Sequence, residues 1–169
     1  MRLCVGVGFL FLWHRLSSLC SKTIMALTRF TITQRNLPHW HSPGVTYFLT
    51  WRVQSDRLLE PEDRAIALDA VRHWDEKKWI VYAAVVMPDH AHALVRPLPL
   101  VPTDLLADAF HDLSKLIQSV KGYSAYRINR CHNWHGALWQ DESYDRIVRD
   151  ERELQETREY IRYNPVRAG

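Results

Sequence analysis

The stretch WIVYAAVVMPDHAHALVRP, residues 79–97, decides the fold because it contains two apolar segments joined by a short turn. Residues 79–87 are almost all β-branched, aromatic or small and apolar, which is typical of a buried strand. Pro88 and Asp89 favour a turn, and residues 90–96 predict the strand that returns beside the first. The segment therefore predicts an antiparallel hairpin inside a sheet.

The returning strand carries two histidines, His90 and His92, separated by one residue. Successive side chains of a strand point to opposite faces, so both imidazoles should share one face with Leu94. The other face should carry Ala91, Ala93 and Val95. Two imidazoles on one face can converge on a metal ion. The alternative is a partly exposed histidine face on an edge strand. Asp89 is expected to be a turn residue whose side chain points away from this face.

Outward from the hairpin, the sequence predicts the element order β-α-β-β-α-β-α. The flanking elements are a strand at 45–53, a helix from Pro61, a helix from Thr103 to about Gly122, a strand near 146–149 and a last helix from Asp150 to about Asn164. Proline in a first turn, a threonine cap, a glycine stop and the Asp150-x-x-Glu153 pattern mark the helix ends. Pro165 is expected to end the last helix. The order predicts an α+β, ferredoxin-like sandwich with an added C-terminal helix.

A second polar pair, Tyr160 and Asn164, lies on that last helix. Residues i and i+4 of a helix share a face, so the phenol and the amide can approach one point. The structural alternatives are a packed tyrosine and an asparagine that ends the helix before proline. With His90 and His92, the pair would supply a metal site and an oxygen nucleophile, a set suited to attack on a phosphodiester. Two imidazoles, an amide oxygen and substrate oxygens suit Mg²⁺ or Mn²⁺, although imidazole also accepts zinc or nickel.

The composition is that of an ordinary globular protein. The chain has 169 residues, 47% hydrophobic and 24% charged, enough for a single domain with a proper core. Its net charge of +3 does not by itself indicate a nucleic-acid partner. Three scattered cysteines exclude a disulfide framework or a zinc cluster and suit a reducing compartment, so we expect a cytoplasmic protein without a membrane partner.

The first residues differ from the rest of the chain. Residues 3–13 form an apolar run that resembles the start of a secretory signal, but a bilayer span needs ~20 residues and no small-x-small cleavage site follows. Met25 opens a sequence that looks like an ordinary N-terminus. We expect residues 1–25 to be an extension, with an upstream mis-assigned start favoured over a real extension or an export signal. Residues 26–169 should form one domain.

Several motifs together resemble a known family. The histidine pair within VVMPDHAHALVRP (85–97) is similar to the HUH motif of single-tyrosine transposases, in which two histidines flank a hydrophobic residue. The chain most resembles the REP-associated tyrosine transposases. The other matching stretches are LPHWHSPGVTYFLTWR (37–52), LSKLIQSVKGY (113–123), LWQDESYDRIVRDE (138–151) and YIRYNPVRAG (160–169). The last stretch is the most specific, and the likeness runs from about Leu37 to the last residue.

The resemblance implies a role for each residue of the two pairs. His90 and His92 would bind the divalent metal, Tyr160 would be the nucleophile, and Asn164 would complete the metal site. The implied reaction is the cleavage and rejoining of single-stranded DNA that carries a REP-like hairpin, through a 5′-phosphotyrosine. Family members usually continue past the NPVxAG segment, so a C-terminally truncated copy is one alternative. The implied protein is a monomer or a homodimer.

Other side chains are candidates for substrate contacts or for competing roles. The candidates for phosphate contacts are Lys115, Lys121, Arg127, Arg130, Arg146 and Arg149. Those between 121 and 130 are expected to lie in a basic, aromatic linker. Tyr144 and Tyr163 compete with Tyr160 as nucleophile, but neither has an amide four residues later. Two other functions remain open: a decayed module that binds hairpin DNA without cutting it, and a metal phosphodiesterase that uses activated water.

Overall fold

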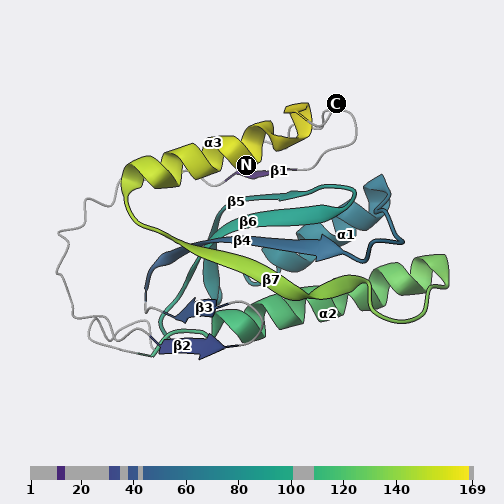
Figure 1. Ribbon diagram of the computed structural model, residues 1–169, viewed down its shortest axis with the longest axis horizontal. Coiled ribbons are helices and arrows are strands. Elements are labelled where there is room, and N and C mark those ends of the chain that lie inside the picture. The colour runs from purple at the N-terminus through teal and green to yellow at the C-terminus, as the bar shows by residue number, and fades with distance from the viewer. Residues whose placement is uncertain (1–10, 14–30, 35–37, 42–43, 101–108, 168–169) are drawn as a thin grey trace.

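The computed structural model describes residues 11–13, 31–34, 38–41, 44–100 and 109–167. Within these residues the chain forms a five-stranded antiparallel sheet, a two-stranded sheet and three helices (Figure 1). The strands are β1 (Phe11–Trp13), β2 (Thr31–Gln34), β3 (Pro38–His41), β4 (Thr46–Val53), β5 (Trp79–Val86), β6 (His90–Pro97) and β7 (Trp139–Val148). The helices are α1 (Pro61–Arg72), α2 (Leu113–His132) and α3 (Glu151–Arg167).

The predicted fold class is confirmed. From β4 to β7 the chain runs β-α-β-β-α-β, and these strands lie in the order β5-β6-β4-β7, which is the ferredoxin-like arrangement with α3 added. β1 pairs with the outer side of β5, so three residues of the expected N-terminal extension lie in the sheet. The rest of residues 1–25 lies outside the described part of the chain. No helix in the described part is long and apolar enough to span a membrane.

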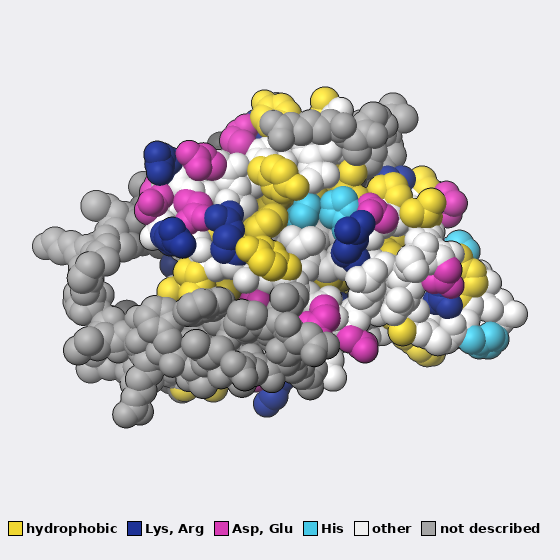
Figure 2. Space-filling model, viewed as in Figure 1, with side chains coloured by type: hydrophobic (Ala, Val, Ile, Leu, Met, Phe, Trp, Pro, Cys, Tyr) yellow, Lys and Arg dark blue, Asp and Glu magenta, His cyan; other side chains and the backbone are white. Residues whose placement is uncertain are grey.

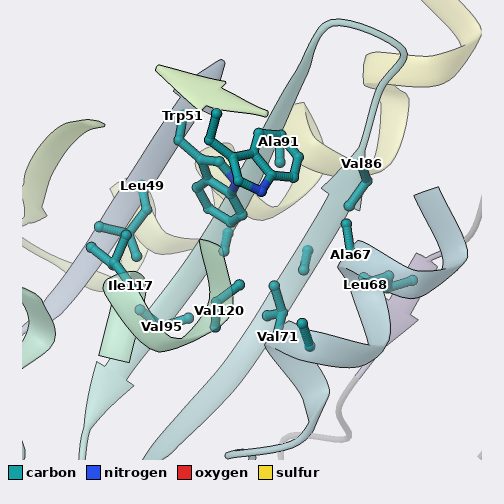
Figure 3. Close-up of a cluster of buried hydrophobic side chains, with 14 of the residues drawn as sticks. Leu49, Trp51, Ala67, Leu68, Val71, Val86, Ala91, Val95, Ile117 and Val120 are labelled. Carbon is teal, nitrogen blue, oxygen red and sulfur yellow. The ribbon is translucent and has the colours of Figure 1, made fainter. Parts of the chain in front are cut away.

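The two faces of the sheet are covered by different helices. α1 and α2 lie on one face and α3 on the other, as Figure 1 shows. The larger core fills the first face and includes Leu49 of β4, Val71 of α1 and Ile117 of α2 (Figure 3). A smaller core under α3 contains Phe48, Leu94 and the fully buried Ile161, among others. Among the described residues, the apolar cluster under α3 is therefore the smaller of the two.

The alternation predicted for β6 is confirmed. Ala91, Ala93 and Val95 belong to the core under α1 and α2, whereas Leu94 belongs to the core under α3. Because neighbouring side chains of a strand alternate, the two histidines lie on the α3 face. In the register with β4, Thr50 lies opposite His92 and Arg52 opposite His90.

The helix expected from Thr103 begins later than predicted. Thr103 lies in residues 101–108, outside the described part of the chain, and Phe110 lies in an isolated β-bridge before the helix. α2 begins at Leu113, where the carboxylate of Asp112 accepts hydrogen bonds from two backbone N–H groups of the first turn, at 2.9 and 3.3 Å. Aspartate is a stronger N-cap than threonine.

The same helix also ends later than predicted. Gly122 does not stop α2, which continues for ten more residues to His132 and ends at Asn133 in the left-handed conformation, with φ of 53°. A glycine inside a helix costs about 1 kcal/mol, and the burial of Ser124 and Ile128 beyond it offsets this. The expected basic linker is therefore part of a helix.

β7 is longer than the strand expected near 146–149. Its first half is polar and gives a weak strand signal, but Trp139 pairs with Val53 and donates its indole N–H to Ser124 Oγ at 3.0 Å. Arg149 lies just beyond the strand. Tertiary contacts therefore extend β7 where local sequence does not.

α3 starts as predicted but ends later. The Asp150 carboxylate accepts the N–H of Glu153 at 2.8 Å, whereas the Glu153 carboxylate accepts the N–H of Arg149, not that of Asp150. Pro165 lies inside the helix, which continues to Arg167. Near a helix end proline removes one hydrogen bond, and the burial of the Pro165 side chain offsets that loss.

The continuation of α2 beyond Gly122 gives a stability prediction. Ile128 is fully buried, so Ile128→Ala should lower the free energy of unfolding by about 2–5 kcal/mol in urea denaturation. Leu58→Ala, at a position that is 63% exposed, should change it by less than about 0.5 kcal/mol. Equal effects of the two substitutions would contradict the observed packing of α2.

Candidate metal and nucleophile site

The two imidazoles lie side by side on β6. The centroids of the His90 and His92 rings are 4.7 Å apart, with an angle of 72° between the ring planes. Figure 2 shows histidine side chains at the molecular surface, bordered by acidic, basic and hydrophobic side chains. The two rings are therefore adjacent, as a shared metal ion would require.

His90 is held by the residue before it. Its Nδ1 lies 2.6 Å from Asp89 Oδ1, and the other carboxylate oxygen accepts a hydrogen bond from Arg52 Nη2 at 2.8 Å. Burial raises the pKa of Asp89, but the hydrogen bonds and charges of His90 and Arg52 outweigh it and leave that pKa below its ordinary value. Asp89 is therefore a carboxylate at neutral pH. The expectation that its side chain points away from the imidazoles is wrong, because a side chain at a turn is free to fold back toward the next residue.

His92 lies deeper than His90. It is 6% exposed, its Nδ1 is 2.8 Å from Thr50 Oγ1, and its Nε2 is buried without a hydrogen-bond partner. Burial, together with the charge of His90, lowers the pKa of His92 to about 4 against a smaller opposing effect of Asp89. At neutral pH the ring is therefore uncharged, and one of its two nitrogens carries a lone pair.

Tyr160 comes from α3 to the same place. Its ring centroid is 5.5 Å from that of His92 and 6.0 Å from that of Phe48, both with edge-on geometry. Phe48 also stacks on His92 at 5.2 Å. The side chain of Tyr160 stays 42% exposed, so solvent or substrate can reach it.

The seating of α3 explains this placement. Ile161 and Thr157 are buried against the sheet, as expected from the helical period, and Tyr160 lies at the edge of that buried stripe. Asn164 follows one turn later on the same side of the helix and is half-buried. The structure thus brings Tyr160 to His92, and Asn164 is one helical turn away from Tyr160.

The chemistry of the donor set limits the metal that would fit. In the described part of the chain, no group of three or more His, Cys, Asp or Glu side chains could hold a metal ion. An ion bound at His90 and His92 would take its remaining ligands from other groups, such as an amide, water or phosphate oxygen. The buried, unpartnered Nε2 of His92 fits such an ion.

The candidate phosphate-binding residues are divided between the two faces. Four of them, Lys115, Lys121, Arg127 and Arg130, lie on α2, across the sheet from the imidazoles. Lys121 donates to the backbone carbonyls of Gln140 and Asp141 at 2.6 and 3.0 Å, which ties α2 to β7. Burial lowers the pKa of Lys121, against the opposing charges of Asp141 and Glu142. Arg127 and Arg130 donate to the phenols of Tyr123 and Tyr126, both at 2.9 Å.

Arg146 lies on the face of the histidines. It is opposite Phe48 in the register of β7 and β4, and its guanidinium lies 5.8 Å from the Phe48 ring centroid. It also forms an ion pair with Glu153 of α3. Arg149 is exposed at the end of β7. Arg146 is thus the candidate with a contact to the aromatic cluster of the site.

Sequence reasoning missed three residues of β4 that lie near the imidazoles and gave the wrong orientation to a fourth, Asp89. Phe48, Thr50 and Arg52 alternate along β4, so their shared face was readable from the strand pattern, but their contact with the histidines depends on the register. For Asp89 the sequence shows only that it precedes His90, and not that its carboxylate forms a hydrogen bond with that ring. The competing Tyr144 lies opposite Thr50 and is 52% exposed, while Tyr163 is 46% exposed beside Arg162.

Comparisons with known proteins agree with the fold and indicate a family. Residues 45–164 match the family model described as "Transposase IS200 like". A solved structure of a REP-associated tyrosine transposase bound to a REP hairpin is similar at a TM-score of 0.61 and 20% identity, covering 80% of this chain and 75% of that one. A candidate transposase from Deinococcus radiodurans R1 has a TM-score of 0.48 and 21% identity, covering 77% of this chain and 95% of that one. No curated protein matches the chain.

The chain has a ferredoxin-like sheet, and a transposase family model matches it over residues 45–164. These two findings define a class of proteins that recombine DNA. The chain belongs to the IS200-like transposase family. The family resemblance predicted from the HUH and YIRYNP motifs is confirmed, and DNA binding and recombination are the activities of this class.

The burial of His92 predicts a pH-dependent stability of the metal-free protein. Its folded pKa of about 4 lies below the ordinary value of 6.5, so between these pH values the unfolded chain binds a proton that the folded protein does not. The free energy of unfolding should therefore fall as pH drops from 7 toward 4, by on the order of 3 kcal/mol. Urea denaturation in EDTA should show this fall, and His92→Gln should flatten it.

The matched control is His135→Gln, which replaces an exposed histidine by the same residue. It should leave the slope of stability against pH unchanged. A wild-type slope in His92→Gln would contradict the role assigned to His92.

Proposed function

We propose that this protein cleaves and rejoins single-stranded DNA that carries a REP-like hairpin, through a 5′-phosphotyrosine at Tyr160. The observation that carries the proposal is the 5.5 Å approach of the Tyr160 and His92 rings, which come from α3 and β6. A family model over residues 45–164 supports the transposase activity itself. The hairpin substrate is proposed because the similar solved structure is bound to a REP hairpin.

His90, His92 and Asn164 are the proposed ligands of a divalent ion, Mg²⁺ or Mn²⁺. The proposal is supported by the proximity of the two rings and by the buried His92 Nε2 atom, which has no hydrogen-bond partner. Such an ion, when bound, would polarise the scissile phosphate and offset the charge that builds on its non-bridging oxygens. The buried side of the site strengthens such electrostatic effects, because water is excluded around His92.

Tyr160 supplies the nucleophile. Its phenolic oxygen gives up its proton to solvent and forms a bond to phosphorus as the bond from phosphorus to the 3′-oxygen breaks, and the departing 3′-oxygen takes up a proton from solvent. The products are a 5′-phosphotyrosine and a free 3′-hydroxyl. The phosphodiester energy is conserved in this bond, so another 3′-hydroxyl can reverse the step and join DNA. The partial exposure of Tyr160 supports access of a DNA strand to the phenol.

Contacts with the DNA backbone are proposed at two places. Arg146 and Arg149 at the end of β7 would contact phosphates close to the scissile bond, since Arg146 contacts Phe48 of the site. Lys115, Arg127 and Arg130 on α2 would contact phosphates farther away. Lys121 would act mainly through its bonds to β7.

The decisive experiment is incubation of the full chain with a single-stranded hairpin oligonucleotide and Mn²⁺. The wild-type protein should form a covalent adduct, visible on a denaturing gel. Tyr160→Phe removes only the hydroxyl, so the adduct should disappear while hairpin binding stays within about twofold of wild type. EDTA should abolish the adduct, and added Mn²⁺ should restore it.

Tyr144→Phe and Tyr163→Phe are matched controls, because both phenols are similarly exposed on the same protein. Both should retain the adduct. An adduct that persists in Tyr160→Phe would assign the nucleophile elsewhere. Binding without any adduct would indicate a hairpin-binding module, and cleavage without an adduct would indicate a phosphodiesterase that uses water.

A further inference from the structure

Both imidazoles form hydrogen bonds with neighbouring side chains, Asp89 and Thr50, that have no role in the reaction proposed above. We propose that Asp89, held by Arg52, and Thr50 are positioning residues that fix the proton of each imidazole on Nδ1 and so present both Nε2 lone pairs to one metal ion. The proposal rests on the metal site proposed for His90 and His92.

The argument for Asp89 follows from donor chemistry. Asp89 Oδ1 lies 2.6 Å from His90 Nδ1, and an ionised carboxylate can only accept hydrogen bonds. Nδ1 must therefore carry the proton. In a neutral imidazole the other nitrogen, Nε2, then has the lone pair that a metal needs. A carboxylate on the outer nitrogen also increases the basicity of the ligating one.

Arg52 fixes the carboxylate in turn. Its Nη2 donates to Asp89 Oδ2 at 2.8 Å, so each carboxylate oxygen has its own partner and the plane of the group is set. Arg52 reaches this position because it lies directly opposite His90 in the register of β4 and β6. Its side chain is 61% exposed, and in this proposal it acts on His90 through its ion pair with Asp89.

Thr50 performs the same task for His92. It lies opposite His92 on β4, with Oγ1 at 2.8 Å from Nδ1. The hydroxyl can accept the Nδ1 proton, and the Nε2 atom of His92 is buried with no hydrogen-bond partner. A buried nitrogen that carried a proton there would leave an unsatisfied donor, which is costly. A lone pair directed at a metal ion removes that cost.

The first test measures metal binding by titration of the metal-free full chain with Mn²⁺. Asp89→Asn keeps the shape of the side chain but offers an amide that can donate as well as accept. It should weaken Mn²⁺ binding on the order of 10- to 100-fold, the usual effect of losing an outer partner of a metal ligand. Asp69→Asn is the matched control, because it breaks an exposed 3.6 Å ion pair with Arg72 on α1. It should leave Mn²⁺ binding unchanged.

The second test reads the proton position directly in the metal-free protein. Long-range ¹H–¹⁵N spectra above pH 8 distinguish the two neutral forms of imidazole. Wild-type His90 should have its proton on Nδ1, and Asp89→Asn should shift part of the population to Nε2. A residue with a merely structural role would not move this equilibrium.

The third test concerns Thr50. Thr50→Val keeps the size of the side chain but removes the hydroxyl, so Mn²⁺ binding should weaken by a similar factor and the His92 spectrum should change. Thr50→Ser restores the hydroxyl and should restore Mn²⁺ binding to within about threefold of wild type.

The outcomes separate this proposal from the proposed function. If wild type binds Mn²⁺ and forms the DNA adduct but Asp89→Asn and Thr50→Val bind Mn²⁺ as wild type does, only the positioning proposal is overturned. A proton found on Nε2 of wild-type His90 overturns it as well. If wild type does not bind Mn²⁺, or if His90→Ala and His92→Ala bind it normally, the metal site fails and the positioning proposal fails with it.

Discussion

The register between β4 and β6 is the constraint on which the rest of the structure depends. It places Thr50 opposite His92 and Arg52 opposite His90, while Ala91 and the other alternate residues of β6 enter the core under α1 and α2. A slip of one residue would turn every side chain of β6 to the other face. Imidazoles would then replace alanines against two packed helices, where two polar rings would lack partners. The same pairing therefore stabilises the core and assembles the site.

The unequal cover of the two faces explains why the site can exist. The face under α1 and α2 is filled by the larger hydrophobic cluster, whereas the cluster under α3, counted over the described residues, is smaller. Phe48 belongs to this smaller cluster and stacks on His92, so it shields one side of the ring while Tyr160 lies at its edge. Apolar contacts on one side of His92 and the partial exposure of Tyr160 on the other place a neutral, buried imidazole beside a phenol that solvent can reach.

Strand periodicity made the fold and the orientation of the histidines predictable. The end of α2 and the neighbours of the histidines depend on tertiary contacts and could not be predicted. Local signals placed the end of α2 at Gly122, whereas the burial of Ile128 beyond it carries the helix on to His132. The contact of Asp89 with His90 could not be predicted, because strand or helix periodicity does not determine where a side chain at a turn points. Thr50 was missed for a different reason: sequence gives its face but not its cross-strand neighbour. The conformation of residues 101–108 lies outside the described part of the chain.

The connection between β7 and α3 determines where the phenol lies. Only Arg149 and Asp150 separate the strand from the helix, and Glu153 accepts the Arg149 N–H while it pairs with Arg146 on the strand. These contacts fix the direction in which α3 leaves the sheet, because a two-residue connection bound at both ends has little freedom. The helix then crosses the sheet and brings Tyr160 to His92 of the same chain. The chemistry proposed for the pair therefore does not require a second copy, and both a monomer and a homodimer are compatible with it.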